Sequence, residues 1–340
     1  MKAVQLVEEQ KLVIGEVPTP QPRPGEVLVR VRAVGVCETD VHMYFRARSM
    51  GLASLPVILG HEFSGEVAGL GAGVTDFGVG DRVVVEPVVA CADCPRCRAG
   101  RPNLCVNFRH LGLTEDGCFA EYVVAPARNL HRLPDHVSFE VGAMVEPLAC
   151  TLWGLRRGRL AAGEDILIIG DGLFGLAFAQ FARALGAGRV AVLGHHQERL
   201  ALAREFGADE AMDEREPGVA EMAASLEGGL GPSVVVDTVG SEKSLAQAVA
   251  LGGTGARIVL FGFGASTATV EPLQLVFKEQ DILPVLASPG VWPEVVKLLG
   301  EGKVKPQSFL SQVVPLDDLE QAFLLKASRR PDIFKIVVTV

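Results

Sequence analysis

Four of the seven cysteines in this 340-residue chain lie close together, in a C-x2-C-x2-C-x7-C pattern. They are Cys91, Cys94, Cys97 and Cys105. Spacing this short lets one segment fold four thiolates around a single ion, and a tetrahedron of four cysteines is typical of a closed structural zinc site. An iron–sulfur cluster is the alternative, because four thiolates also hold those. Pro95 and Gly100 favour a loop over a helix here. We therefore expect a lobe whose shape is fixed by the bound metal, and which takes no part in catalysis.

A second group of residues could form an open metal site. Cys37 follows a predicted strand in the stretch GVCETDVH, and His61 follows in the stretch GHE. A catalytic zinc takes three protein ligands and leaves one position for substrate or water, and these two side chains are donors of the right types. Taken singly, each has a plainer interpretation, since a lone cysteine is more often part of the core and GHE could be a capped turn.

Three residues close to Cys37 in the sequence could assist such a site. Asp40 could hold the far nitrogen of His61, which is how a metal-ligating imidazole is commonly oriented. Thr39 and His42 could carry a proton from a metal-bound hydroxyl group to solvent.

A glycine-rich loop follows the apolar stretch Ile166–Ile169 and opens a helical stretch, which is the context that gives a G-x-G-x-x-G pattern its meaning. The first glycine makes a tight turn, the second lets the backbone approach a pyrophosphate, and the third lets helix and strand pack closely. The helix N-terminus then attracts the phosphates. Asp171 is unusual inside such a loop, and we expect its charge to face solvent. The candidate dinucleotide-binding residues are Gly170, Gly172, Leu173, Phe174 and Gly175.

The next predicted strand, 189–193, ends without the acid that would bond the ribose hydroxyls of NAD. Gly194 stands at that position, followed by His195, His196 and Arg199. A glycine leaves room for a 2′-phosphate, and the following side chains could supply donors or positive charge. The sequence therefore predicts use of both NAD(H) and NADP(H), leaning to NADP(H). The alternative is that His195, His196 and Arg199 simply form a solvent-exposed turn and the start of a helix, with no role in cofactor binding.

The elements that must position these residues change in type along the chain. The first third is β-rich, with alternating strands expected at 27–34, 65–70 and 81–85. From about residue 147, helices alternate with apolar strands, which indicates an α/β doubly wound parallel sheet. Helices are expected at 147–160, 173–185, 197–206 and 242–251, and strands at 166–169, 189–193, 234–237 and 257–261. We expect one domain of residues 1–147 and 290–340, with the cysteine lobe at 91–105, and a dinucleotide-binding domain of 148–289.

Composition narrows the class of protein. The formal net charge is −9, which argues against a nucleic-acid partner, because binding phosphates needs clustered cations. No apolar run is long enough for a membrane span, and the start MKAVQLVEEQK lacks the apolar region of a secretory signal. A cytoplasmic protein is therefore expected.

Several stretches occur in one order over nearly the whole chain: GVCETDVH, GHEFSGEV, the four-cysteine segment, DGCFAEYVV, VEPLA and the glycine loop. Together they resemble the zinc-containing medium-chain dehydrogenase/reductase superfamily, especially its polyol (sorbitol-type) and threonine dehydrogenase branches. The resemblance implies a GroES-like catalytic domain, a Rossmann domain and assembly as a homodimer or homotetramer. The apolar stretch 282–286 could pair across such an interface as an edge strand.

The resemblance also places a third ligand of the catalytic zinc at Glu146, bound directly or through a water. Cys150, one helical turn further on, is the rival ligand. Glu62 matches a family glutamate that lies near the metal. Two zinc ions per chain are thus implied, one catalytic and one structural.

The activity implied is transfer of a hydride between a secondary alcohol and a nicotinamide cofactor, with zinc acting on the hydroxyl group. Polyols or amino alcohols suit the resembling branches, and a dehydrogenase of simple alcohols or aldehydes is the alternative. A zinc-free reductase of the same superfamily would lack Cys37 and GHE. A non-enzymatic, nucleotide-sensing module with a zinc lobe would need a basic face, against which the acidic composition counts.

Overall fold

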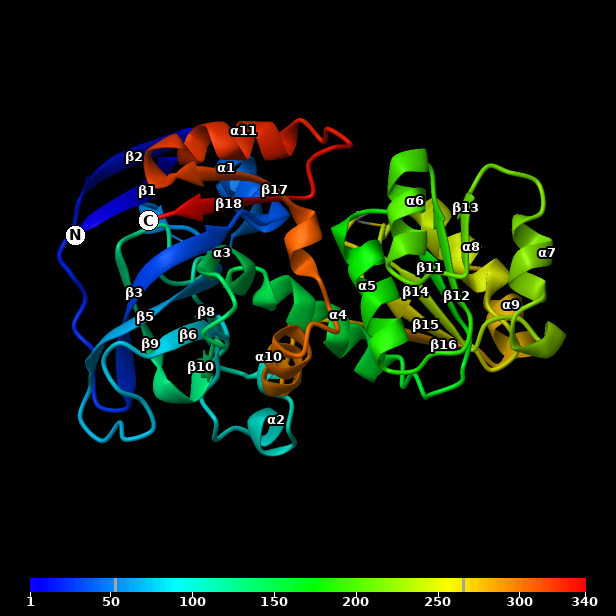
Figure 1. Cartoon of the computed structure of the whole chain (residues 1–340), viewed down its shortest axis with the longest axis horizontal. Helices are drawn as coiled ribbons and strands as arrows, with labels where there is room; N and C mark the ends of the chain where they lie inside the picture. Colours follow the sequence, from blue (N-terminus) through cyan, green and yellow to red (C-terminus); the bar gives the residue numbers. More distant parts are fainter. Residues whose placement is uncertain (52–53, 265–266) are drawn as a thin grey trace. The chain divides into compact units, whose positions relative to one another are not determined.

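The computed structural model describes residues 1–51, 54–264 and 267–340 (Figure 1). The chain divides into two compact units. The first unit comprises Met1–Pro147, Pro289–Gly300 and Pro306–Val340, and the second comprises Leu148–Ser288 and Glu301–Lys305. Within the described ranges, no helix combines the length and apolar character needed to cross a bilayer. The catalytic and dinucleotide-binding roles expected of the domains stay predictions.

Three sheets form the first unit, and nearly all their strand pairs are antiparallel. A seven-stranded sheet has the order β10-β6-β5-β3-β18-β17, with β9 also pairing with β3. Its strands are β3 (Glu26–Gly35), β5 (Glu62–Leu70), β6 (Arg82–Val85), β9 (Tyr122–Pro126), β10 (Leu130–Arg132), β17 (Leu310–Pro315) and β18 (Lys335–Thr339). The smaller sheets contain β1 (Lys2–Glu8), β2 (Lys11–Glu16) and β4 (Val57–Ile58), and β7 (Val88–Val89) with β8 (Arg109–His110).

Alternation of apolar and polar side chains explains the central strand β3. Val27, Val29 and Val31 are buried, whereas Arg30 between them is exposed, so one face of the strand packs on the core. The strands expected at 27–34, 65–70 and 81–85 correspond to β3, β5 and β6. The N-terminal hairpin of β1 and β2 and the strands β9, β10 and β17 were not expected.

The helices of the first unit are short. They are α1 (Glu38–Met50), α2 (Pro95–Arg98), α3 (Phe139–Gly142), α10 (Trp292–Gly300) and α11 (Leu319–Ala327), and α4 (Val145–Arg157) runs across the boundary between the units. Helix α2 corrects the expectation of a loop in the cysteine lobe. Pro95 stands at its first position, where the missing N–H costs no helical hydrogen bond, so proline starts this turn of helix.

The second unit has a six-stranded parallel sheet, in the order β13-β12-β11-β14-β15-β16. Its strands are β11 (Ile166–Ile169), β12 (Val190–Gly194), β13 (Glu210–Asp213), β14 (Val234–Asp237), β15 (Arg257–Leu260) and β16 (Asp281–Pro284), and its helices are α5 (Leu173–Ala184), α6 (Gln197–Glu205), α7 (Val219–Ala224), α8 (Glu242–Leu251) and α9 (Pro272–Lys278). The predicted doubly wound α/β fold is confirmed.

Strand order in this sheet determines where a ligand can bind. The chain runs outward from β11 through β12 to β13, and then returns to the other side of β11 for β14 and the strands beyond it. All residues of β11 and β14 are buried, as expected of strands covered on both faces (Figure 1). Open α/β sheets bind ligands outside the carboxyl ends of the strands at such a reversal. The glycine loop 170–175 follows β11 at this point.

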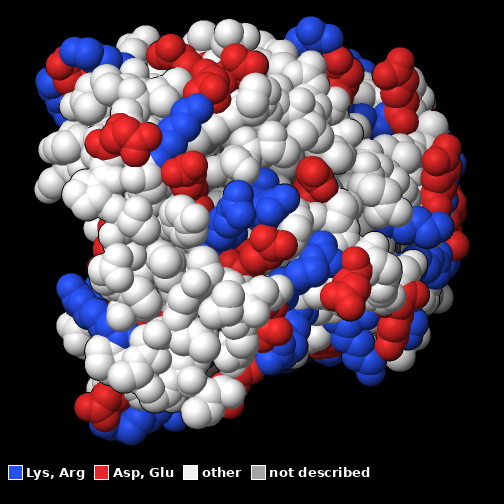
Figure 2. All heavy atoms as spheres, turned by 60° about the vertical axis from the view of Figure 1, so that its left-hand side comes forward, with Lys and Arg blue, Asp and Glu red and all other residues white. Residues whose placement is uncertain are grey.

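Charged side chains of both signs lie interspersed on the face drawn in Figure 2. Independently of that view, ion pairs of the first unit join opposite charges, such as Arg32 with Glu66 at 3.1 Å and Lys2 with Asp317 at 2.5 Å. Neighbouring opposite charges weaken the single-sign field that attracts a polyanion. That nucleic acid is not a partner remains a prediction.

Candidate functional site

The four cysteines of the lobe are brought together in the first unit, with their sulfur atoms all within 4.8 Å of one another. The Sγ atom of Cys91 lies 3.4 Å from that of Cys105 and 3.9 Å from that of Cys97. Four ligands about 2.3 Å from one ion would stand about 3.8 Å apart. Backbone N–H groups of Val106 and Cys97 lower the pKa of Cys94 to about 6, which favours its thiolate. The lobe therefore fits a tetrahedral zinc ion.

The second cluster joins Cys37, His61 and Glu62, which offer one ligand atom each within 4.8 Å of one another. Cys37 lies between the end of β3 and the first turn of α1, and Glu62 begins β5. His61 and Glu62 are buried, with exposed fractions of 4% and 1%. A thiolate and an imidazole are ligands that zinc prefers, so the donor set fits a zinc ion.

Asp40 holds the two segments of this cluster in place. Its carboxylate is fully buried and accepts hydrogen bonds from the backbone N–H of Cys37 at 2.9 Å and of Gly60 at 3.1 Å. Its Oδ1 atom lies 3.4 Å from Nδ1 of His61. One carboxylate thus fixes the backbone beside both predicted ligands, and Nε2 of His61 is the ring nitrogen that faces away from it.

Of the two residues predicted to carry a proton, Thr39 is the nearer to Cys37, with its Oγ1 atom 3.6 Å from the Cys37 sulfur. His42 is partly exposed, and its Nε2 atom lies 3.8 Å from the Glu38 carboxylate. A path from the cluster toward solvent through these side chains stays a prediction.

Glu146 is not within the group formed by Cys37, His61 and Glu62. It lies in the first turn of α4 and is buried. Burial, followed by the negative charge of Glu146, raises the pKa of Glu86 to about 7. The charge of Glu146 also contributes to raising the pKa of Lys335, which bonds Glu62, so Glu146 lies within electrostatic reach of the cluster. Its role as a third ligand stays a prediction, as does the rival role of Cys150.

Lys335 was missed by the sequence interpretation. It is buried on β18, and its ammonium group donates hydrogen bonds to Oε2 of Glu62 at 2.5 Å and to the carbonyl of Val36 at 3.2 Å. Burial is the largest single effect and lowers the pKa of Lys335, but the charges of Glu62, Cys37 and Glu146 and the hydrogen bond to Glu62 together outweigh it, so the pKa is raised. The signal was a lysine within the apolar strand sequence FKIVVTV, because a buried lysine needs a partner.

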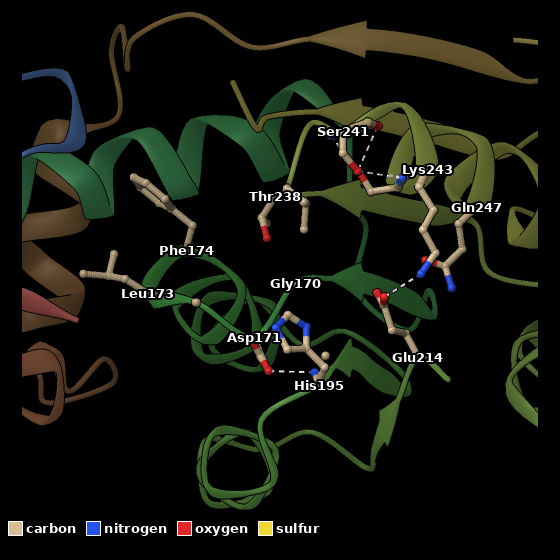
Figure 3. A pocket seen from close by; sticks show the side chains of 14 residues that line it. Gly170, Asp171, Leu173, Phe174, His195, Glu214, Thr238, Ser241, Lys243 and Gln247 are labelled. Carbon is tan, nitrogen blue, oxygen red and sulfur yellow. Dashed lines mark hydrogen bonds and ion pairs between the residues drawn. The ribbon is translucent and has the colours of Figure 1, made fainter. Parts of the chain in front are cut away.

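The second unit carries a cavity of about 270 Å³ at the glycine loop (Figure 3). Predicted residues that line it are Gly170, Gly172, Leu173, Phe174, Gly194 and His195. Lining residues that the sequence interpretation missed include Thr238, Val239, Ser241, Lys243 and Gln247, which follow β14. They could be expected only from the strand order, which makes the carboxyl end of β14 a neighbour of β11.

The three glycines of the loop have the environments that their predicted roles require. Gly170 has a φ of +113°, which favours glycine at this turn. A Cβ atom at Gly175 would lie 1.8 Å from the carbonyl oxygen of Gly170, so only glycine lets helix α5 pack this closely. Gly172 has open space around its Cα, where a ligand could approach.

The expectation that Asp171 faces solvent is wrong. Its side chain is buried, and its Oδ2 atom accepts a hydrogen bond from the backbone N–H of His195 at 2.8 Å (Figure 3). The same oxygen accepts a hydrogen bond from the backbone N–H of His196, also at 2.8 Å. The side chain of His196 lies 3.0 Å from the same oxygen, and that of Arg199 3.8 Å from the other. The donors at the start of α6 attract the carboxylate inward. His196 and Arg199 are therefore directed at Asp171.

Comparison with known proteins assigns both units to families. Residues 23–135 match the alcohol dehydrogenase GroES-like domain, and residues 174–301 match the zinc-binding dehydrogenase family. Human sorbitol dehydrogenase is 33% identical over 311 residues, covering 90% of this chain and 87% of that protein.

Solved structures agree along the whole chain. The crystal structure of an alcohol dehydrogenase (rspB) from Escherichia coli CFT073, complexed with NADH, has a TM-score of 0.92 and 31% identity, covering 100% of this chain and 99% of that one. The structure of a zinc-binding dehydrogenase from Sinorhizobium meliloti 1021, bound to NADP, has a TM-score of 0.89, also with 31% identity and the same coverage. The chain is thus a member of the zinc-containing alcohol dehydrogenase family, in the polyol dehydrogenase branch of the medium-chain dehydrogenase/reductase superfamily.

Proposed function

We propose that this protein is a zinc-dependent dehydrogenase that transfers a hydride between a secondary alcohol of a small polar substrate and a nicotinamide cofactor. The observation that carries the proposal is the cluster of partly buried Cys37 with buried His61 and Glu62, held by Asp40 and Lys335. The polyol or amino-alcohol class of substrate is supported by the similarity to sorbitol dehydrogenase.

In this proposal Cys37 and His61 hold the catalytic zinc, with Glu146 as the third ligand, directly or through a water. When bound, zinc acts as a Lewis acid on the substrate hydroxyl, and the nicotinamide accepts the hydride. Asp40 orients His61 and fixes the backbone of Cys37 and Gly60. Thr39 and His42 carry the released proton toward solvent.

Lys335 has a different task beside the metal. Cys37, Glu62 and Glu146 bring several potential negative charges to one buried region, and the raised pKa of Lys335, in which the Glu62 carboxylate is the largest favourable contribution, keeps one positive charge among them. The charge of Lys335 stabilises the Glu62 carboxylate in the interior. A second zinc ion in the four-cysteine lobe is proposed to be structural.

The cofactor is proposed to be NAD(P)(H), bound at the glycine loop. The lean toward NADP(H) predicted from Gly194, His195, His196 and Arg199 assumed open space beside Gly194. Asp171 lies beside Gly194, which weakens that argument.

A homodimer or homotetramer is also proposed. Strand β16 is at the edge of the six-stranded sheet, so its outer backbone groups are available for pairing. Large apolar side chains are exposed on helix α9, which precedes β16 in the sequence, and just after the strand: Leu273, Val276 and Phe277 on α9, and Leu286. A cytoplasmic location stays a prediction from the sequence.

The test is a dehydrogenase assay with purified protein over polyols, amino alcohols and simple alcohols, with each nicotinamide cofactor. We expect the wild type to oxidise at least one polyol faster than it oxidises the simple alcohols. This activity should be lost in Cys37→Ser. Zinc-loaded protein that reduces no cofactor with any alcohol of the panel contradicts the proposal.

A further inference from the structure

Gly194 and Asp171 compete for one space at the rim of the cofactor pocket. A Cβ atom at Gly194 would lie 2.4 Å from Cβ of Asp171 and 2.5 Å from its Oδ2 atom. Cβ atoms do not approach other atoms this closely, so only one of the two positions can carry a side chain there. The loop after β11 therefore fills the space that a side chain at the end of β12 would occupy.

In an NAD-binding Rossmann unit, the acid that meets the adenosine ribose stands near the end of the second strand, about 20 residues beyond the glycine loop. That position is Gly194 here, and the carboxylate beside it belongs to Asp171. We infer that Asp171 supplies this acid from within the glycine loop and selects NAD(H) over NADP(H). The inference rests on the proposed function, because it takes the pocket at the glycine loop to be the dinucleotide site.

The hydrogen bonds of Asp171 keep the carboxylate charged and leave one oxygen less occupied. Burial is the largest single effect and raises its pKa, but the backbone N–H groups of His196 and His195 and the side chain of His196 together outweigh it and lower the pKa. Both N–H groups bind Oδ2. Oδ1 lies 3.2 Å from the His196 ring nitrogen and 3.8 Å from Arg199. A carboxylate has room for about four donors, so Oδ1 can accept a ribose hydroxyl.

Two basic side chains in this region, Lys243 and Arg215, are paired with carboxylates. Lys243, which lines the pocket, bonds Glu214 at 2.8 Å (Figure 3). Arg215 bonds Asp213 through two of its nitrogen atoms, at 2.8 and 2.5 Å. A 2′-phosphate at this rim would therefore meet the Asp171 carboxylate, while these two basic side chains already have acidic partners.

This arrangement argues against the predicted preference for NADP(H), and it also limits which substitutions can test the preference. The single substitution Gly194→Asp does not simply add an acid, because the new side chain would collide with Asp171. The informative pair is Asp171→Asn, which keeps an oxygen for both N–H groups but removes the charge, and the reciprocal exchange Asp171→Gly with Gly194→Asp.

The experiment is equilibrium binding of NADH and of NADPH to the zinc-loaded protein, followed by the fluorescence of the reduced nicotinamide and by calorimetry. The wild type should bind NADH at least about tenfold more tightly than NADPH, since like charges brought together cost several kcal/mol. Asp171→Asn should shift the ratio by about tenfold toward NADPH, and the reciprocal exchange should restore a preference for NADH.

Asp209→Asn is the matched control. This carboxylate also accepts a backbone N–H, from Val190 at 2.7 Å, but it does not line the pocket. The ratio should stay at the wild-type value in this variant. If Asp171 served only to hold the turn, Asp171→Asn would change both affinities alike, and an unchanged ratio overturns the inference. Tighter binding of NADPH by the wild type overturns it as well. Binding of neither cofactor overturns the proposed function itself.

Discussion

The ammonium group of Lys335 donates a hydrogen bond to the carboxylate of Glu62, 273 positions earlier in the sequence. Both side chains are almost completely buried, with exposed fractions of 5% and 1%. Replacing Lys335 by Met leaves Glu62 as an unpaired buried charge, which should lower the free energy of unfolding by about 3–5 kcal/mol. Chemical denaturation measures this. Lys303→Met, which breaks an exposed pair with Glu301, should cost less than about 1 kcal/mol. Equal losses in the two variants contradict a special role for Lys335.

Asp40→Asn should weaken zinc binding at the proposed catalytic site by about 10- to 100-fold, because the charge that orients His61 is lost. Competition with a chelator, at a fixed zinc content of the four-cysteine lobe, measures the affinity. Asp116→Asn is a suitable control, because Asp116 also accepts a backbone N–H, from Ile58 at 2.9 Å. That variant should keep the wild-type affinity. Similar weakening in both would show that Asp40 acts only through the local backbone.

The two clusters should respond differently to loss of one cysteine. Cys37→Ser should abolish turnover while leaving the thermal midpoint close to that of the wild type. Cys97→Ser should lower the midpoint and make the segment 91–105 sensitive to protease, because a structural zinc contributes folding free energy. Metal analysis should find two zinc ions per wild-type chain and one in each variant. A fully active wild type with one zinc per chain contradicts this scheme.

Glu146→Ala should lose nearly all activity, whereas Cys150→Ala should be mild. The reason is that Glu146 lies within electrostatic reach of Lys335 and Glu86 and is proposed to complete the zinc site. Turnover and zinc content are measured together, so that loss of metal can be separated from loss of chemistry. The reverse order of the two variants would make Cys150 the ligand.

His131 should make the protein less stable in acid. Its ring stacks on Trp292, with centroids 5.5 Å apart, and burial lowers its pKa to about 4. Between pH 6.5 and 4 the unfolded chain takes up a proton that the folded protein refuses, so stability falls with pH by up to about 3 kcal/mol. His131→Phe keeps a stacked ring and should reduce this fall. His136→Asn, at an exposed position, should leave the fall in stability unchanged. If the free energy of unfolding depends on pH equally in the wild type and in His131→Phe, the fall is not due to His131.

Much of this molecule is predictable because its signals are local. The strand Ile166–Ile169, its glycine loop and the following helix each depend on neighbours in sequence, and the cysteine spacing from 91 to 105 brings the thiolates together within one segment. That Cys37 and His61 belong to one site could be predicted only by combining the ligand types that zinc prefers with the family resemblance.

What escaped prediction depends on tertiary contacts. Lys335 reaches Glu62 because β18 and β5 both pair with β3, and no local pattern specifies that order. Asp171 is buried because the turn after β12 supplies two backbone N–H groups to its carboxylate. The sequence of the glycine loop alone does not reveal these donors. A polar residue within an apolar or glycine-rich segment was, in both cases, the sign of a distant partner.

The position of β18 between β3 and β17 also sets an order of assembly during synthesis. The six strands of the second unit are all present once residue 284 has been made, so its parallel sheet can close on the ribosome. The sheet of the first unit lacks β18, the strand between β3 and β17, until residues 335–339 emerge. Until then the Glu62 carboxylate lacks the ammonium group of Lys335, so the charge balance of the metal cluster depends on a segment made after every strand of the second unit.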